Sequence, residues 1–340
     1  MIHGIAAMLM VFHHLFGFPD RVNVPFVMLF DFSFLHVETI LSYWGRICIS
    51  MFAFCSGYGL CKLAFQNIYE KKNLIVSGYQ MVISQLKKFY PRLWLVCFIF
   101  IPLGYLMGVY QFNAIIFLKS LIGISSFYNA EWWYTAYYLR FLLLFPILYS
   151  ILVWVYKQSK KCSTLIVFTA IFAITVFYIL LPEKGFWSTF LCFLMGMVVV
   201  AFDLFEMLYQ LLLKLGKWQY ILSVTVGLLA VFARIVLKIN CDYDYIVTPI
   251  LIFCILVIMK SKLCSKYIKP PLTKLGKYST YIWLTHTFFV YYYFQKLTYA
   301  PRYSTLIFIW CLFLSIASGI LMEKILYFVQ IGIGRAKIRS

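Results

Sequence analysis

The sequence predicts an all-α membrane protein in which about ten helices cross the bilayer. Three observations support this class. The chain of 340 residues is 64% hydrophobic and only 12% charged, whereas soluble domains average about 25% charged residues. Its mean hydropathy is +0.89. Apolar runs near the length of a transmembrane helix, about 20 residues, recur from one end of the chain to the other.

Ten apolar segments form the predicted transmembrane helices, and the short connections between them indicate a single membrane-embedded domain over residues 1–340. These segments are 2–18, 39–62, 93–110, 132–156, 163–181, 186–204, 219–237, 244–260, 278–297 and 304–328. A further apolar stretch, 112–128, is interrupted by Lys119, Gly123 and two serines. We interpret it as an interfacial or re-entrant segment, with an eleventh span as the alternative.

Lys and Arg residues are divided unevenly between the two sides of these spans. Most of them lie in the loops 63–92, 157–162, 205–218 and 261–277 and in the C-terminal tail. Because cytoplasmic loops of membrane proteins carry the excess of Lys and Arg, we expect these loops and both termini in the cytoplasm. The net charge of +19 then belongs to loops that flank the membrane, and it does not indicate binding to nucleic acid.

The sequence contains no familiar metal or phosphate motif. Its ten cysteines form no CxxC pair and no Cys/His spacing typical of a metal site, so we expect no bound metal. A Gly-rich phosphate loop, a GxSxG elbow and an HExxH motif are also missing. A cofactor with phosphate groups must therefore bind through basic residues, which are most abundant on the cytoplasmic side.

The first apolar segment, MIHGIAAMLMVFHHLFG, carries three histidines. His3 and His14 are separated by about 16 Å along a helix and share nearly one face, whereas His13 points about 100° away. Ionisable side chains inside a span are costly and usually functional. Since burial disfavours the charged imidazole, His14 is a candidate proton acceptor. It would deprotonate a hydroxyl for acyl transfer, relay protons in a transporter, or bond a backbone carbonyl in a structural role.

Other polar residues lie within or beside the predicted spans. Arg46 and Arg140 lie inside spans, so we expect them to pair with polar groups in a cavity, or with a helix carbonyl. His286 lies near the middle of the ninth span. Five further groups face the same side as the outer end of the first span: Asp20, Asp31, His36, Glu38 and Glu131.

Segments along nearly the whole chain, taken in order, resemble the acyltransferase-3 family of membrane acyltransferases. The opening stretch resembles the family's start, in which ten residues separate a basic residue from a histidine, here His3 and His14. The other segments that carry the resemblance are WGRICISMFAFCSGYGL with Ser56-Gly57, KKFYPRLW with Lys88 and Pro91, EWWYTAYYLRFLLLFP, FLCFLMGMV, and LGKYSTYIWLTHTFF with Ser279 and His286.

The resemblance implies transfer of an acyl group, usually acetyl from acetyl-CoA, to a hydroxyl of an extracytoplasmic carbohydrate at the inner membrane of a bacterium. It implies that His14 is the general base. The family has Arg or Lys where this chain has His3, so either His3 or another cation, Lys88 or Arg92, would hold the CoA phosphates. Apart from the resemblance, Glu131 is a candidate catalytic residue that would orient the acceptor or the base; the alternative is a solvated helix start, where an acid complements the helix dipole.

The remaining candidates are assigned to the carbohydrate acceptor. They are Arg46, Trp132, Trp133, Arg140 and His286. The aromatic segment 132–138 is also typical of an interfacial belt, and Ser56-Gly57 is typical of a close helix contact. Two other functions stay open: a transporter of a glycan or lipid-linked sugar that uses His14, Arg140 and His286 as a polar relay, and a non-catalytic partner in capsule assembly.

Overall fold

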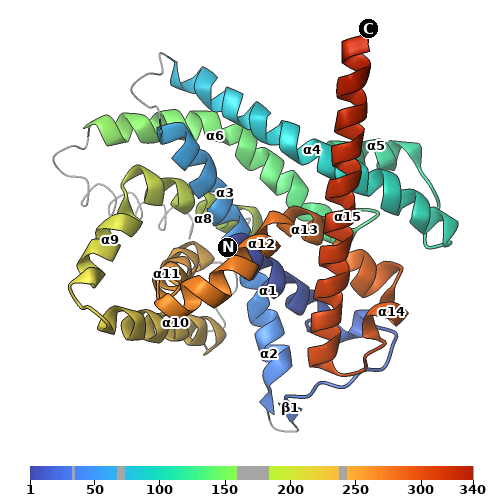
Figure 1. Cartoon of the computed structure of the whole chain (residues 1–340), viewed down its shortest axis with the longest axis horizontal. Helices are drawn as coiled ribbons and strands as arrows, with labels where there is room; N and C mark the ends of the chain where they lie inside the picture. Colours follow the sequence, from blue (N-terminus) through green and yellow to red (C-terminus); the bar gives the residue numbers. More distant parts are fainter. Residues whose placement is uncertain (33–34, 67–72, 159–183, 237–242, 340) are drawn as a thin grey trace. The chain divides into compact units, whose positions relative to one another are not determined.

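A computed structural model describes residues 1–32, 35–66, 73–158, 184–236 and 243–339, and these residues are mostly helical (Figure 1). In this part of the chain a two-residue hairpin, β1 (Asp31–Phe32) with β2 (Leu35–His36), is the one small sheet. The helices are α1 (Ile2–Phe16), η1 (Pro19–Arg21), α2 (Val37–Trp44), η2 (Gly45–Ile47), α3 (Cys48–Phe65), α4 (Leu74–Leu106), α5 (Ala114–Ile122), η3 (Ala130–Trp132), α6 (Trp133–Gln158), α8 (Lys184–Ala201), α9 (Leu204–Leu213), α10 (Trp218–Val236), α11 (Asp244–Ile258), η5 (Cys264–Ile268), α12 (Lys269–Lys277), α13 (Ser279–Thr287), η6 (Phe288–Tyr292), α14 (Gln295–Tyr299) and α15 (Ser304–Arg339).

Five helical segments of the described chain are long and apolar enough to cross a membrane: Val37–Phe65, Leu74–Leu106, Ala130–Lys157, Trp218–Val236 and Ser304–Ile331. A sixth forms if α8 and α9, which meet at a bend of 63°, make one broken span. The all-helical membrane class is therefore confirmed, and the expected number of about ten spans is not.

The other predicted spans correspond to shorter or divided helices, or lie outside the described residues. The apolar helices α1 and α11 have 15 residues each, about 22 Å, which is shorter than a hydrocarbon core of about 30 Å. Segment 278–297 divides into α13, the π-helical η6 and α14. The predicted span 163–181 lies outside the described residues. In the 112–128 stretch, α5 has nine residues, which favours the interfacial interpretation over an eleventh span.

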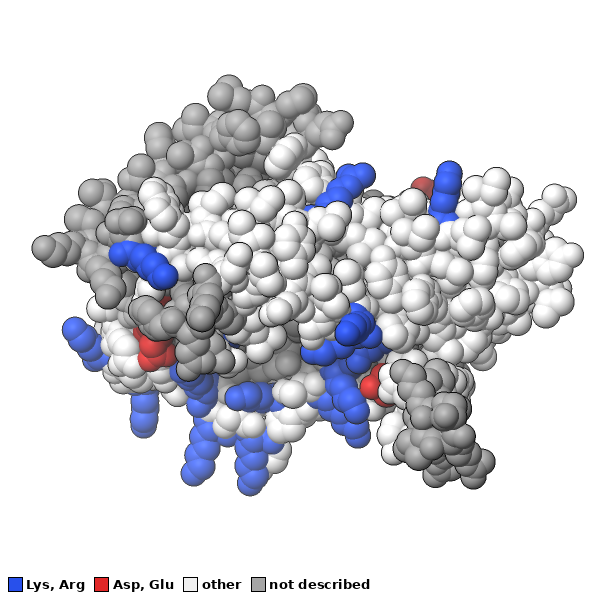
Figure 2. Space-filling model, turned by 90° about the horizontal axis from the view of Figure 1, so that it is seen from above, with Lys and Arg blue, Asp and Glu red and all other residues white. Residues whose placement is uncertain are grey.

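The surface is as apolar as a lipid-embedded protein requires. Most of the face seen in Figure 2 carries neither basic nor acidic side chains. Large apolar side chains are exposed on the long helices, including Trp154 (63% exposed), Phe232 (62%) and Phe313 (57%). In water such a surface would be an aggregation hazard, whereas hydrocarbon tails solvate it well.

The described residues form two compact units whose segments alternate along the chain. The first contains Met1–Ala6, Arg46–Ser84 and Tyr137–Thr273, and the second contains Ala7–Gly45, Gln85–Ala136 and Lys274–Ser340. The prediction of one domain over residues 1–340 stays a prediction.

The first unit is built on the close contact of α3 with α8. A Cβ atom at Gly57 would collide with the backbone carbonyl of Phe193, and one at Gly196 would collide with the carbonyl of Phe54. Glycine is therefore what allows the two backbones to approach. Ser56 donates a hydrogen bond to the Phe52 carbonyl of its own helix (2.8 Å). This geometry agrees with a structural role for the Ser56-Gly57 pair.

A buried ion pair joins three helices of the same unit. Arg234 of α10 donates to both carboxylate oxygens of Asp244 of α11, at 2.8 and 3.2 Å. Ser50 of α3 donates a third hydrogen bond to that carboxylate, at 2.9 Å. Asp244 is fully buried and Arg234 is 7% exposed. A buried charge pair is retained only where further hydrogen bonds satisfy it, as they do here.

The second unit holds the end of α1 against α13, η6, α14 and α15. The connection that follows α1 is fixed to α15: Val27 N–H donates to the Arg302 carbonyl (2.8 Å), and Ser304 N–H donates to the Val27 carbonyl (2.9 Å). The Glu38 side chain binds Ser304 and accepts from the Phe30 N–H. This bonding positions the polar residues that follow α1.

Candidate active site

His14 lies in the last turn of α1 and is 7% exposed. Its ring is surrounded by other rings. The centroid of His286 lies 5.0 Å away, that of His13 lies 5.0 Å away, and those of Phe18 and Tyr291 each lie 6.0 Å away. The structure thus brings the two candidate residues His14 and His286 into ring contact.

Glu131 lies beside His14 and binds a cation on its other side. Oε2 of Glu131 lies 3.8 Å from Nε2 of His14, and Oε1 accepts a hydrogen bond of 3.0 Å from Arg21. The guanidinium of Arg21 also lies over the ring of Tyr291, 4.3 Å from its centroid. The Tyr291 hydroxyl in turn donates to the backbone carbonyl of His14 (2.5 Å). We call His14, His286, Glu131, Arg21 and Tyr291 the histidine–glutamate cluster.

Arg21 keeps its positive charge in this position. Partial burial lowers the pKa of its guanidinium, but the hydrogen bond to Glu131 and the neighbouring acidic groups outweigh that effect and raise it. Arg21 therefore stays positively charged where it donates to Oε1 of Glu131.

A buried asparagine sets the position of Glu131. Asn129 caps η3 by accepting the N–H of Glu131 on Oδ1 (3.0 Å), and its Nδ2 donates to the Thr287 hydroxyl of α13 (2.7 Å). Trp132, also buried, donates from its indole to the Leu284 carbonyl (3.1 Å). These bonds fix η3 to α13. With 1% of its surface exposed, Trp132 offers no open ring face to a sugar, contrary to its sequence-based assignment. The tight packing of η3 on α13 is the reason.

The two adjacent histidines of α1 have different partners. His13 donates from Nδ1 to the carbonyl of Ser42 (2.7 Å), a bond that also fixes its tautomer, because a carbonyl only accepts. The two rings lie 5.0 Å apart, centroid to centroid, so the adjacent histidines differ in their hydrogen-bond partners and not in their neighbourhood. Nδ1 of His14 is buried and has no hydrogen-bond partner among the described residues. An unpaired buried nitrogen is costly unless a ligand satisfies it.

His286 shows the same feature. Its Nδ1 bonds to the carbonyls of Ile282 (2.9 Å) and Trp283 (3.1 Å), so this nitrogen carries the proton. Its Nε2 is therefore an acceptor in the neutral ring, and it too is buried without a partner in the described chain. Two unsatisfied nitrogens thus lie on contacting rings, a suitable arrangement for the hydroxyl groups of a bound molecule.

The other polar groups predicted at the outer end of the first span bond to neighbouring residues or are exposed. Asp31 accepts hydrogen bonds from Thr39 and the Glu38 N–H, and the exposed His36 lies 3.6 Å from Asp31. Asp20 is exposed. Glu131 is therefore the acidic residue of the predicted five that the described structure brings to His14.

Three predicted site residues belong to the first unit, whereas His14 belongs to the second: His3, Arg46 and Arg140. The His3 ring lies 5.9 Å from that of Phe52. Arg46 and Arg140 are exposed, so the expected enclosure in a polar cavity is wrong for both. The guanidinium of Arg140 lies over Tyr137 and Phe186, at 5.9 and 5.7 Å, where aromatic faces provide its contacts. Trp133 is half-buried and contacts Tyr134.

The predicted donor residues Lys88 and Arg92 line a pocket of about 510 Å³ in the second unit. Five basic residues and one acidic residue contribute to its wall: Lys87, Lys88, Arg92, Lys277, Lys324 and Glu323. Arg92 lies 3.9 Å from Glu323 and over the ring of Tyr281. We call this the basic pocket. An excess of cations from α4, α12 and α15 is suited to phosphate groups.

Helix α13 joins the basic pocket to the histidine–glutamate cluster. Tyr278, immediately before α13, lines the pocket, and His286 lies in the helix's last turn. Along the helix axis these two residues are about 12 Å apart. Both sites thus lie along one helix of one compact unit.

Sequence reasoning missed Arg21 and Tyr291. Arg21 resembled an ordinary loop charge, and Tyr291 lies in the run VYYYF, which is typical of an interfacial belt. The one available signal was the position of Arg21, seven residues beyond His14 and therefore just outside the same helix.

One family model covers most of the chain. The chain matches the model of the acyltransferase-3 family, described as an acyltransferase domain, over residues 2–324. Curated proteins and solved structures give no significant match. The matched region contains α1, the histidine–glutamate cluster and the apolar helices of membrane-spanning length. The protein therefore belongs to the acyltransferase-3 family and is an integral membrane protein of that family.

Proposed function

We propose that this protein transfers an acetyl group from acetyl-CoA to a hydroxyl of an extracytoplasmic carbohydrate, with His14 as the general base. The observation that carries the proposal is the position of His14: its Nε2 faces the carboxylate of Glu131 at 3.8 Å, and its Nδ1 is buried and unpaired in the described chain. A base oriented by a carboxylate is the arrangement used in many acyl transfers.

In this mechanism Glu131 selects the tautomer of His14. A carboxylate favours the N–H on the nitrogen that faces it, so Nε2 carries the proton and Nδ1 has a free lone pair. The distance of 3.8 Å is longer than a hydrogen bond, as is common before substrate binds. Arg21 holds the carboxylate from its other side. Glu131 and Arg21 are thus positioning residues in the proposal.

The chemical step begins when Nδ1 of His14 accepts the proton of the acceptor hydroxyl. The oxygen attacks the thioester carbonyl of acetyl-CoA and forms a tetrahedral intermediate. This intermediate expels the CoA thiolate, leaving the acetyl ester on the carbohydrate, and the imidazolium returns its proton to the sulfur. Each proton and electron pair is accounted for without a metal. His286 accepts a hydrogen bond from a second hydroxyl of the same sugar on its unpaired Nε2.

The donor binds with its phosphates in the basic pocket, in contact with Lys88 and Arg92. Charge-assisted bonds to phosphate are among the stronger polar contacts. The pantetheine arm then follows α13 toward His286 and His14. The proposal includes a membrane topology. The basic loops and both termini lie in the cytoplasm, and the carbohydrate reaches the site from the outer side of a bacterial inner membrane.

The proposed transporter is less well supported. It depends on a relay through His14, Arg140 and His286, but Arg140 is exposed and belongs to the other unit. No observation in the described chain favours that relay over acyl transfer.

The test is a comparison of surface carbohydrate from cells that carry the wild-type gene, no gene, or a gene for His14→Ala. We expect an acetyl mass increment in the wild type alone. His36→Ala is the matched control, because His36 is exposed and lies in the same unit. It should keep the increment. An identical glycan mass in cells with and without the gene, at confirmed protein levels, contradicts the proposal.

A further inference from the structure

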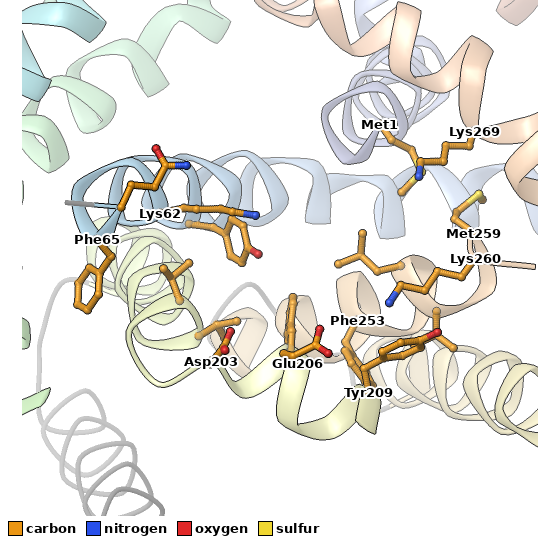
Figure 3. A pocket seen from close by; sticks show the side chains of 17 residues that line it. Met1, Lys62, Phe65, Asp203, Glu206, Tyr209, Phe253, Met259, Lys260 and Lys269 are labelled. Atoms are coloured by element: carbon orange, nitrogen blue, oxygen red, sulfur yellow. The ribbon is translucent and has the colours of Figure 1, made fainter. Parts of the chain in front are cut away.

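A second pocket, of about 740 Å³, lies within the first unit (Figure 3). Its walls come from α3, from the α8–α9 break and from the end of α11, with Met1 and Lys269 at one side. The volume falls in the usual range for small-molecule sites, about 300–1,000 Å³. None of the residues proposed above for acyl transfer lines it. It is therefore an unassigned cavity.

Three lysines from separate elements contribute positive charge to this pocket: Lys62 in the last turn of α3, Lys260 after α11, and Lys269 at the start of α12. Figure 3 shows the Lys260 ammonium group pointing into the cavity, where it lies 3.0 Å from the centroid of the Tyr209 ring. Lysine is a common ligand of phosphate groups. This set favours an anion.

Two carboxylates, Asp203 and Glu206, line the wall on the α8–α9 side (Figure 3). Asp203 has a left-handed backbone (φ 52°) at the break, and the bend of 63° there directs α9 along the pocket. The negative charges of these two carboxylates do not balance the positive charges of the three lysines. They are acceptors for hydroxyl groups, so the ligand that fits carries hydroxyls as well as phosphate.

Aromatic rings form the rest of the wall. Phe205 stacks on Tyr58 at 6.2 Å and contacts Phe253 at 5.3 Å. Ring faces of this kind pack on flat bases and on acyl chains alike. The pocket thus combines an anion-binding part, a hydroxyl-binding part and an apolar part.

We propose that this pocket binds a phosphorylated amphiphile, with its phosphate on Lys62, Lys260 and Lys269, its hydroxyls on Asp203 and Glu206, and its apolar part on the aromatic wall. Two sources supply this chemistry. One is the membrane itself, through a phosphoglycerol lipid headgroup, since basic pockets between membrane helices bind such anions. The other is a soluble phosphate that carries hydroxyl groups, such as glycerol 3-phosphate.

The experiment uses the full chain, purified in detergent. Phosphatidylglycerol is titrated against a phosphatidylcholine background and detected by native mass spectrometry, and glycerol 3-phosphate is titrated by calorimetry. The Lys62→Gln/Lys260→Gln variant should bind the effective ligand about tenfold or more weakly, because each lysine contributes a charge-assisted bond. Lys214→Gln/Lys217→Gln removes the same charge from exposed positions outside the pocket and should bind as the wild type does.

Binding of phosphatidylglycerol that depends on the pocket lysines supports a lipid occupant, and such binding of glycerol 3-phosphate supports a soluble one. If neither ligand binds the wild type more tightly than the pocket variant, the proposal is overturned. Lys62→Arg/Lys260→Arg keeps both charges and should restore binding, which separates lost charge from lost folding. No step needs acyl transfer, so this outcome is independent of the proposed function.

Discussion

The carboxylate of Glu131 lies 3.8 Å from Nε2 of His14, although the two residues come from η3 and α1. Arg21 holds the other oxygen of the same carboxylate at 3.0 Å. His14 is buried in this contact, at 7% exposed, and buried ionisable groups in membrane proteins are expensive and usually functional. The proposed base and its positioning carboxylate, which Arg21 holds, give this contact a function.

The first prediction concerns the two adjacent histidines. His14→Ala removes the proposed base and should lower the rate of acetyl transfer by about 10²–10⁴-fold. His13→Ala loses a hydrogen bond to the Ser42 carbonyl and should have a much smaller effect on the rate. The measurement is transfer of labelled acetyl to surface glycan in membranes with matched protein levels. Full activity in His14→Ala with loss in His13→Ala would show that the catalytic histidine has been misassigned.

The second prediction concerns the charge on Arg21. Arg21→Gln leaves Glu131 without its cation, so the tautomer of His14 is less well fixed and kcat should fall, with the KM for acetyl-CoA little changed. Arg21→Lys keeps the charge and should recover part of kcat. A role limited to folding would instead lower the amount of stable protein, which thermal unfolding in detergent detects. Equal kcat in the wild type and Arg21→Gln would remove Arg21 from the proposed mechanism.

Local sequence pattern predicted the elements of this protein better than it predicted the contacts between them. Apolar runs predicted spans at 39–62 and 304–328, where the structure has the apolar helical segments Val37–Phe65 and Ser304–Ile331, because hydropathy is a local property. Hydropathy could not predict that segment 278–297 divides at η6, because the segment is apolar on both sides of the division. Resemblance to a family selected His14. The contacts of Arg21 with Glu131 and Tyr291 join segments far apart in sequence, and no local period encodes such pairs.

The third prediction concerns the basic pocket. Lys88→Gln removes one proposed phosphate contact and should raise the KM for acetyl-CoA about tenfold, with kcat nearly constant, because the lost bond is distant from the reacting atoms. Lys119→Gln is the control: Lys119 is exposed in the same unit and does not line the pocket. Unchanged donor kinetics in Lys88→Gln, compared with Lys119→Gln, would place the CoA phosphates elsewhere.

The fourth prediction concerns two glycines of α3. Gly57→Ala should destabilise the protein by about 1–3 kcal/mol, because its Cβ would collide with the backbone carbonyl of Phe193. Gly59→Ala meets nothing within 4 Å and should be neutral or slightly stabilising, since alanine favours a helix by about 1 kcal/mol over glycine. Thermal unfolding in detergent compares the two variants. Equal unfolding temperatures would mean that α3 and α8 do not depend on the glycine contact.

The last prediction concerns the buried pair of Arg234 and Asp244. Asp244→Leu leaves the Arg234 charge buried and its guanidinium without the two hydrogen bonds that Asp244 accepts, so the free energy of unfolding should fall by about 3–5 kcal/mol. Replacing both residues, as Arg234→Met/Asp244→Leu, removes the charges together and should cost much less, because no uncompensated charge remains. A double-mutant cycle measured by unfolding in detergent separates the pairwise interaction from the loss of each side chain. If the double variant is as unstable as the sum of the two single variants, then the pair contributes no coupling, and α3, α10 and α11 are held together by apolar packing alone.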